Sequence, residues 1–241
     1  MTTATHLPTA GLIVPPAAGE VPPEAVMYPQ VNFIAEGLGL QSVDPQGYDQ
    51  VIESVVAKAK QLVARGAQAV SLMGTSLSFY RGHQTNAELI QAMQDATGVP
   101  CTTMSQAVIR ALQALQAKKV AVATSYVEVV NERLLAFMQA EGYTAVSCQG
   151  LGENGVEAMA QISTPQLVDL CIQAYEQALE PADAILLSCG GLRTLDTILA
   201  VEQQLGVPVV ASSPAGFWDV VSLVSPRPAQ TQWGRVAAIA S

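Results

Sequence analysis

The sequence has few of the residues that most catalytic centres and most charged interfaces require. It contains only two histidines, His6 and His83, so a histidine-rich metal centre or a serine triad would lack its usual ligands or base. Charged residues make up 13% of the chain and the formal net charge is -9, which leaves no basic surface to neutralise phosphates. We therefore expect no metal and no nucleic-acid partner.

Long apolar runs are also missing. No stretch of about 18 apolar residues could span a bilayer, and residues 1–10 contain neither Lys or Arg nor the apolar core of a signal peptide. The four cysteines, which are Cys101, Cys148, Cys171 and Cys189, lie far apart without the paired spacing of a zinc site, and we expect free thiols. These absences predict a cytoplasmic protein with no membrane partner.

The chain does have 241 residues with 50% hydrophobic content, which is enough for one large α/β domain or two lobes. Short aliphatic runs alternate with amphipathic stretches, a pattern typical of a doubly wound α/β fold with parallel strands. The expected strands are residues 11–14, 69–73, 120–124, 184–188 and 207–211. Helices are expected over residues 51–63 and 107–115, and from Ser163 or Thr164, where a hydroxyl cap and Pro165 mark a helix start.

Two parts of the chain resemble each other. A strand that ends near Gly74 leads through a helix to Gly-Val-Pro at 98–100, and a strand that ends near Cys189 leads to Gly-Val-Pro at 206–208. The repeat is imperfect because more residues separate the two features in the first half. It predicts two similar lobes with Gly74 and Cys189 at equivalent positions, so that a thiol faces the cleft from one side only.

Cys189 is the candidate reactive residue because it follows a strand, and α/β folds bind ligands beyond the carboxyl ends of their strands. Gly190 and Gly191 come next, and glycines let backbone N–H groups approach a carboxylate or an enolate oxygen. The alternative interpretation is that Cys189 is a small buried hydrophobe and that the glycines only turn the chain.

Thr75, Ser76 and Tyr126 add hydroxyl groups at the same edge of the predicted sheets. No Lys or Arg falls within these segments, so an anion bound there would depend on hydroxyl and amide donors. For any one hydroxyl taken alone, the more common role is to cap a helix or form a turn.

Other candidate features receive no role. Cys101, Cys148 and Cys171 fall in apolar patterns and are expected in the core, and His83 is expected in a polar loop. Residues 37–40 (GLGL) resemble part of a nucleotide-binding loop, but no strand is expected before them and no complete phosphate-binding motif occurs. NAD and ATP are therefore not expected as cofactors.

Five segments carry the most specific signal: residues 14–19 (VPPAAG), 37–40 (GLGL), 71–82 (SLMGTSLSFYRG), 188–192 (SCGGL) and 213–219 (SPAGFWD). In this order and spacing they resemble the arylmalonate decarboxylases of the aspartate/glutamate racemase superfamily, over nearly the whole chain. The resemblance implies two Rossmann-like lobes with parallel four-stranded sheets, related by pseudo-twofold symmetry, with the active site in the cleft between them. It implies a first lobe over 1–116, a second over 117–215, and a C-terminal helix and tail over 216–241 that return to the first lobe.

The resemblance also implies an activity, that of a carboxy-lyase. It would decarboxylate disubstituted malonates with an aryl or alkenyl group to enantioenriched 2-aryl acids, without a metal or organic cofactor, and Cys189 would protonate one face of an enediolate. The implied dioxyanion hole consists of Thr75, Ser76, Tyr126, Cys189 and Gly190. The implied hydrophobic pocket for the leaving carboxylate consists of Pro15, Leu40, Val43, Tyr48, Leu77, Val156 and Met159. The expected partner is a small malonate, and the oligomeric state stays open, a monomer included.

The implied chemistry is physically coherent. An apolar wall removes hydration from a leaving carboxylate, whereas neutral carbon dioxide loses little there. Negative charge then spreads over the retained carboxylate, where each well-placed donor contributes about 3 kcal/mol. A thiol with an ordinary pKa near 8.5 is mostly protonated at pH 7 and can act as an acid, although a nearby helix N-terminus would lower that pKa.

Racemases of the superfamily have a cysteine on each side of the substrate, whereas this chain has Gly74 on one side, which favours one-sided protonation. The alternatives are another superfamily activity, such as a maleate cis-trans isomerase or an amino-acid or hydantoin racemase, and an inactive protein that binds small acids. Arg193 lies where the decarboxylase pattern has an apolar residue, which bears on substrate preference.

Overall fold

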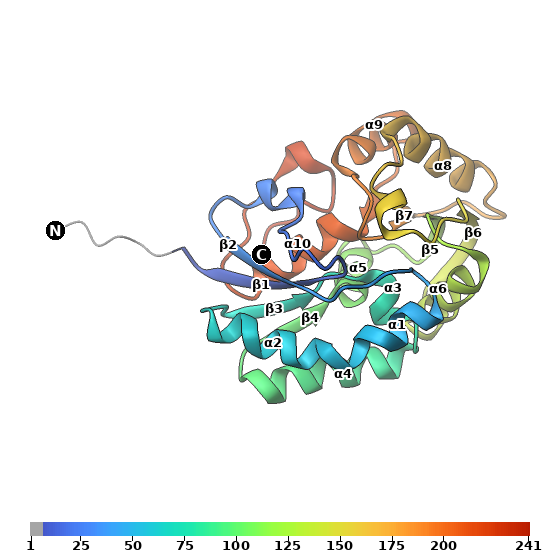
Figure 1. The fold of residues 1–241 in the computed structure, drawn as a ribbon. Helices are drawn as coiled ribbons and strands as arrows, with labels where there is room; N and C mark the ends of the chain where they lie inside the picture. The colour runs from blue at the N-terminus through green and yellow to red at the C-terminus, as the bar shows by residue number, and fades with distance from the viewer. Residues whose placement is uncertain (1–6) are drawn as a thin grey trace.

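The structure is a computed structural model that describes residues 7–241, and it contains two four-stranded parallel sheets (Figure 1). The first sheet has the order β2-β1-β3-β4, with β1 Thr9–Val14, β2 Asn32–Gly37, β3 Ala69–Leu72 and β4 Cys101–Thr103. The second has the order β6-β5-β7-β8, with β5 Lys119–Thr124, β6 Thr144–Gly150, β7 Ala184–Ser188 and β8 Val209–Ala211. The predicted α/β fold with two parallel sheets is therefore confirmed.

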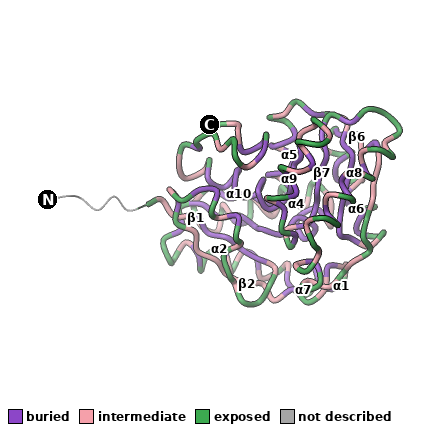
Figure 2. The backbone as a smooth tube through the Cα atoms, turned by 90° about the horizontal axis from the view of Figure 1, so that it is seen from above, coloured by how far each residue is buried: buried purple, intermediate pink, exposed green. Residues whose placement is uncertain are grey.

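The helices cover both sheets, as parallel sheets require. In chain order they are α1 Pro45–Val51, α2 Val55–Ala64, α3 Thr75–Phe79, α4 His83–Thr97, α5 Met104–Ala114, α6 Glu128–Ala140, α7 Val156–Met159, α8 Thr164–Glu176, α9 Leu195–Leu205 and α10 Ser212–Ser222. Short 3-10 helices span Pro23–Met27, Ile52–Ser54 and Thr231–Trp233. Figure 2 shows buried residues concentrated along the strands and exposed residues along the outer loops.

All five predicted strands are present, although β8 begins two residues later than expected. The predicted helix over 51–63 is wrong as one element, because α1 ends at Val51 and the turn Ile52–Ser54 separates it from α2. Asp44 starts α1 early, since its Oδ1 accepts a hydrogen bond from the Gly47 N–H at 2.9 Å. The other two predicted helices are confirmed, and Ser163 is the N-cap of α8.

Three smaller predictions are wrong. His83 is the first residue of α4 and does not lie in a loop. Residues 37–40 do follow a strand, because β2 ends at Gly37. Cys148 lies within β6 and is only half-buried, whereas Cys101 and Cys171 are buried as expected and all four cysteines are free.

The two sheets have the same strand order, so the repeat predicted from sequence is present in the fold. Gly98 and Gly206 end α4 and α9 in the same left-handed conformation, with φ of 73° and 71°, which glycine adopts without strain. The extra residues of the first half form α3, which begins directly after Gly74, whereas residues 189–194 of the second half form a loop before α9.

Several contacts join the two halves. Helix α10 packs against α5 and contacts strands of both sheets, although it follows the second sheet in the chain. Asp219 on α10 accepts hydrogen bonds from Thr102 Oγ1 at 2.6 Å and from Arg110 Nη1 at 2.9 Å. The lobe boundaries at 116 and 215 stay a prediction.

A second connection joins the two halves through the loops before α1 and α7. Ser42 forms an antiparallel bridge with Gly155, and the Val43 N–H donates to the Asn154 carbonyl at 2.9 Å. Within residues 7–241, no helix is both long and apolar enough to cross a membrane.

Candidate active site

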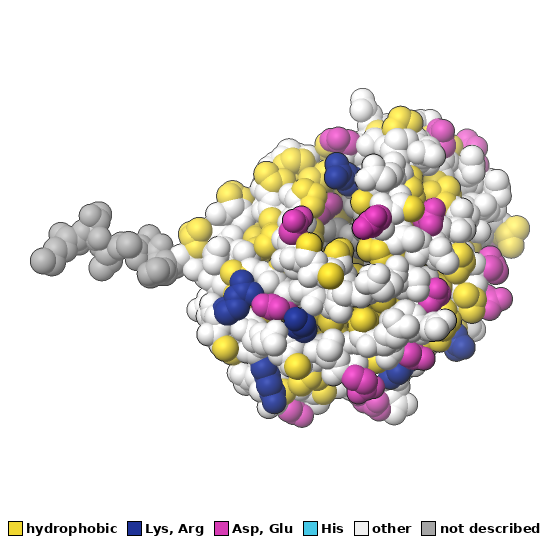
Figure 3. Space-filling view, viewed as in Figure 1, with side chains coloured by type: hydrophobic (Ala, Val, Ile, Leu, Met, Phe, Trp, Pro, Cys, Tyr) yellow, Lys and Arg dark blue, Asp and Glu magenta, His cyan; other side chains and the backbone are white. Residues whose placement is uncertain are grey.

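A cavity of about 290 Å³ lies between the two sheets, at the carboxyl ends of β1, β3 and β7. Figure 3 shows a hollow near the middle of the face in view. Val14 at the end of β1 lines the cavity, as do Gly74 after β3 and Cys189 after β7. Because β3 and β7 hold the same place in their sheets, Gly74 and Cys189 enter the cavity from equivalent positions. The thiol therefore has no cysteine counterpart on the other side of the cavity.

One side of the cavity, which we call the donor side, carries Thr75, Ser76, Cys189 and Gly190. The Thr75 hydroxyl donates to Sδ of Met104 at 2.9 Å, a weak acceptor that an anion could replace. A Cβ on Gly190 would lie only 3.0 Å from that same Sδ, so the close packing here requires a glycine. In the described part of the chain, the Gly190 N–H donates to no protein acceptor.

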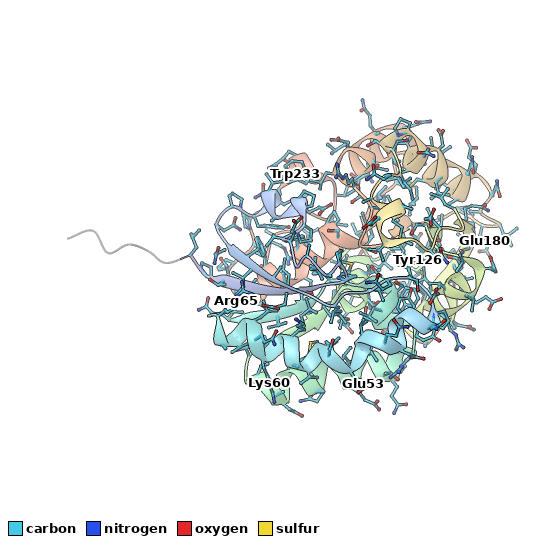
Figure 4. All side chains as sticks on the ribbon, in the orientation of Figure 1. Glu53, Lys60, Arg65, Tyr126, Glu180 and Trp233 are labelled. Atoms are coloured by element: carbon cyan, nitrogen blue, oxygen red, sulfur yellow. The ribbon has the colours of Figure 1, made fainter. Side chains whose placement is uncertain are left out.

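Tyr126 and Tyr48, both predicted site residues, do not line the cavity and are buried beside it, each with 1% of its surface exposed. The Tyr126 hydroxyl lies 3.3 Å from Ser188 Oγ, and Figure 4 shows Tyr126 near the middle of the molecule. The Tyr48 hydroxyl is buried without a hydrogen-bond partner among the described residues. Burial raises the pKa of both phenols, so they stay protonated and can donate toward Ser76 and Cys189.

The Cys189 thiol is 4% exposed and contacts sulfur, amide and hydroxyl groups. Its Sγ donates to Sδ of Met159 at 3.3 Å and accepts from the Gly191 N–H at 3.4 Å. Burial raises the pKa of Cys189, while hydrogen bonding from Ser125, Gly191 and Tyr126 lowers it to a smaller extent. Helix α9 begins only at residue 195, so no helix starts directly behind the thiol.

A second group of lining residues is apolar, and six of the seven predicted pocket residues belong to it. We call this set the apolar wall: Pro15, Leu40, Val43, Leu77, Val156 and Met159. The first four come from the first half of the chain, whereas Val156 and Met159 come from α7 in the second half. The bridge between Ser42 and Gly155 connects the two contributing loops, so the wall is complete only when both halves are in contact.

Charged residues also line the cavity, and sequence reasoning missed most of them. They are Glu20, Glu24 and Arg193, and we call these three the charged rim. Burial raises the pKa of Glu24, which is 3% exposed, while Ser213 and Arg193 nearby lower it. Only Arg193 had a sequence signal, because the glutamates lie in a proline-rich stretch typical of a loop.

The described residues contain no group of three or more His, Cys, Asp or Glu side chains placed to hold a metal ion. Neutral donors can hold an anion on one side, and the thiol can exchange a proton with a carbon beside it.

Comparisons with known proteins identify the family of this chain. Residues 10–237 match the family model described as arylmalonate decarboxylase. An arylmalonate decarboxylase from Bordetella bronchiseptica is 61% identical over 217 residues, which is 90% of each chain. A crystal structure of an arylmalonate decarboxylase with a glycine-to-cysteine and a cysteine-to-serine substitution, in liganded form, has a TM-score of 0.91 and 57% identity, and covers 95% of this chain and 98% of that one.

A maleate cis-trans isomerase structure from Nocardia farcinica, bound to TRIS, is similar in fold, with a TM-score of 0.87. Its sequence identity is 20%, and the match covers 96% of this chain and 98% of that one. At this level the likeness shows the shared fold alone.

Proposed function

The chain belongs to the arylmalonate decarboxylase family and is a carboxy-lyase, and from this membership we propose that Cys189 supplies the proton that completes the reaction. Family membership supports decarboxylation of arylmalonates as the overall reaction. The observation that carries the role of Cys189 is its position: a buried thiol that lines the cavity between the donor side and the apolar wall.

The proposed substrate is a malonate with an aryl or alkenyl group on its central carbon. The bond between that carbon and one carboxylate breaks, and carbon dioxide leaves. The electron pair of the broken bond stays on the central carbon and spreads onto the retained carboxylate as an enediolate. The Cys189 S–H then gives its proton to that carbon, and the resulting thiolate regains a proton from water.

The donor side would hold the retained carboxylate and the enediolate that forms from it. Thr75, Ser76 and the Gly190 N–H can donate directly, since all three line the cavity. Tyr126 would act from its buried position beside the cavity, through its contacts with Ser76 and Cys189. Donors fixed in place by a buried site stabilise developing charge strongly, by about 3 kcal/mol for each well-placed donor.

The apolar wall would receive the leaving carboxylate. An ionised carboxylate loses hydration against side chains such as Leu40 and Met159, while neutral carbon dioxide loses little there. The wall therefore raises the free energy of the bound malonate relative to the transition state, which favours bond cleavage.

The thiol suits an acid more than a nucleophile. Because burial raises the pKa of Cys189, the proton stays on sulfur at neutral pH until a carbanion forms beside it. The Gly191 N–H, which lies 3.4 Å from Sγ, then stabilises the thiolate that remains. Gly74 offers no acid on the other side, so protonation from one face yields one enantiomer.

A decarboxylation assay tests this proposal. The purified protein is given 2-methyl-2-phenylmalonate and its alkenyl analogue, with and without EDTA, and carbon dioxide release and product chirality are measured. We expect turnover that EDTA does not change and an excess of one enantiomer. Absence of turnover, or a racemic product, would overturn the proposed one-sided protonation. Maleate tested in the same assay distinguishes the isomerase alternative, which 20% identity does not favour.

A further inference from the structure

The charged rim has no part in the chemistry proposed above, although its three residues line the cavity. Glu24 is buried at the start of the 3-10 helix Pro23–Met27, and Glu20 and Arg193 are exposed at the cavity mouth. Figure 3 shows acidic and basic side chains at the edge of the hollow. A buried carboxyl group next to a substrate cavity needs a polar partner, because its burial is otherwise unfavourable.

The groups of the rim keep unused hydrogen-bonding capacity. Arg193 is close enough to Glu24 to affect its ionisation, yet among the described residues it forms no ion pair. Arg193 is also the one Lys or Arg side chain among the described residues that line the cavity. Its guanidinium donors are therefore available to a ligand that reaches this part of the cavity, which the Glu24 carboxyl group, with Ser213 nearby, also lines.

The position of the aryl group follows by elimination, and this step rests on the proposed function. If the donor side holds one carboxylate and the apolar wall receives the other, the remaining large substituent lies among the other lining residues, which include Pro16, Val21, Pro22, Pro23 and Leu192 as well as the charged rim. Glu24 lies in the 3-10 helix Pro23–Met27 and Arg193 in the loop before α9, and because both line the cavity, the outer edge of an aromatic ring there can reach both.

The charges of the rim discriminate between ring substituents. A plain phenyl ring removes water from Glu24 and Arg193 and returns no hydrogen bond. An anionic substituent would be attracted by Arg193 but repelled by Glu20 and Glu24, and a cationic substituent would be attracted by the two glutamates but repelled by Arg193, so each has at least one unfavourable neighbour. A hydroxyl group is neutral, donates to a carboxyl oxygen and accepts from a guanidinium, so it satisfies both neighbours.

We propose that Glu24 and Arg193 form a subsite for a hydroxyl group on the aryl ring, so that hydroxyarylmalonates are the preferred substrates of this enzyme. The hydroxyl donates its hydrogen to a carboxyl oxygen of Glu24 and accepts a hydrogen bond from the guanidinium of Arg193. Both residues are specificity determinants that touch the substrate away from the reacting carbon.

The test compares two substrates of the same size, 2-methyl-2-(hydroxyphenyl)malonate and 2-methyl-2-(methylphenyl)malonate, each as the meta and para isomer. We expect at least one hydroxyl isomer to have a kcat/KM about tenfold above that of its methyl partner, since hydrogen bonds to charged groups are the stronger ones. The ratio of two substrates in one preparation cancels any fraction of protein that fails to fold.

Three variants assign the preference to the rim. Arg193→Leu should reduce the ratio of kcat/KM for the hydroxyl substrate to kcat/KM for the methyl substrate to about one. Glu24→Gln should reduce this ratio by a smaller factor, about threefold, because a neutral carbonyl oxygen accepts a hydrogen bond more weakly than a carboxylate. Arg65→Leu removes the same charge at an exposed position near one edge of the molecule (Figure 4) and should leave the ratio unchanged. A net-charge effect would move the ratio in both arginine variants.

The outcomes separate this inference from the proposed function. Turnover of 2-methyl-2-phenylmalonate, whose ring has no substituent, tests the proposed function alone and does not depend on any preference between ring substituents. A parent enzyme that turns over phenylmalonate but prefers the methyl substrates would overturn the subsite. So would a hydroxyl preference that Arg193→Leu and Glu24→Gln both leave intact, or a carboxyphenyl substrate that exceeds the hydroxyl one.

Discussion

The Sγ atom of Cys189 lies 3.3 Å from Sδ of Met159, so the thiol touches the apolar wall while it also belongs to the donor side. A thioether is a weak acceptor and does not draw the proton away from sulfur. The group that we propose as the acid is thus placed between the surface that receives the leaving carboxylate and the donors that hold the enediolate.

The first prediction concerns pH. Burial raises the pKa of Cys189, and the reaction needs the protonated thiol, so kcat should be level through neutral pH. It should be lost as pH rises through this raised pKa, at a midpoint above about 8.5, the value of a free cysteine. Carbon dioxide release at saturating substrate measures it, and circular dichroism at each pH checks that the fold persists. A decline that is complete below pH of about 8 would show a thiolate in the resting enzyme.

The second prediction concerns the apolar wall. Val43→Thr replaces a methyl group of nearly the same shape with a hydroxyl that can bond to the leaving carboxylate. Because that bond stabilises the bound malonate and is lost with carbon dioxide, both kcat and KM should fall, kcat by roughly tenfold. Val56→Thr, on α2 and away from the cavity, is the matched control. A Val43→Thr enzyme with unchanged kcat would speak against the role of the wall.

The third prediction concerns the symmetry of the two halves. Gly74→Cys puts a second thiol into the cavity opposite Cys189, at a backbone φ of -134° that any residue adopts. The new Cβ would lie 3.3 Å from Pro15 Cγ and Leu77 Cβ, so small shifts are needed and decarboxylation should slow. The variant should racemise a single-enantiomer 2-arylpropionate, as measured by chiral chromatography.

Gly74→Ala is the control for this experiment, because it introduces the same Cβ without a thiol. If Gly74→Cys leaves the optical purity of the arylpropionate as stable as Gly74→Ala does, the two positions do not face the same carbon, and the symmetry interpretation fails.

The fourth prediction concerns the packing of the two halves. Asp219→Ala removes the acceptor of Thr102 and Arg110 and leaves a buried hydroxyl without a partner. The free energy of unfolding should fall by about 2 kcal/mol, measured by urea denaturation. Asp49→Ala breaks the exposed ion pair with Arg81 and should change the free energy of unfolding by less than about 1 kcal/mol. Equal losses of stability in the two variants would show that the buried Asp219 contact stabilises the protein no more than an exposed ion pair does.

Sequence patterns were sufficient for the inner strands because burial on both faces selects continuous aliphatic runs, as in β3 and β7. They failed for β2, an edge strand whose residues are exposed or half-buried and include Asn32 and Glu36. Without β2, the motif at 37–40 was assigned to a loop with no strand before it. Gly37 leaves no room for a Cβ next to the Ala17 carbonyl, which explains the glycine without any nucleotide.

The site was predictable where strand ends meet and not where loops fold back. Gly74, Thr75 and Cys189 directly follow strands or begin a helix, so topology brings them to one edge. Glu24 lies in a short 3-10 helix whose position depends on tertiary packing, and no periodicity predicts that its carboxyl group is buried. Tyr126 was expected at the cavity surface but is buried beside it, a difference of side-chain depth that residue spacing does not encode.

The most direct test of the proposed mechanism compares Cys189→Ser with Cys148→Ser, since Cys148 is half-buried in β6 away from the cavity. Carbon dioxide release from 2-methyl-2-phenylmalonate is measured for both variants and the parent, at matched folded concentration. A hydroxyl is a far weaker acid than a thiol, so Cys189→Ser should lose at least about 100-fold in kcat, while Cys148→Ser retains the parent rate. A Cys189→Ser enzyme that releases carbon dioxide at the parent rate would contradict the proposal that this thiol delivers the proton.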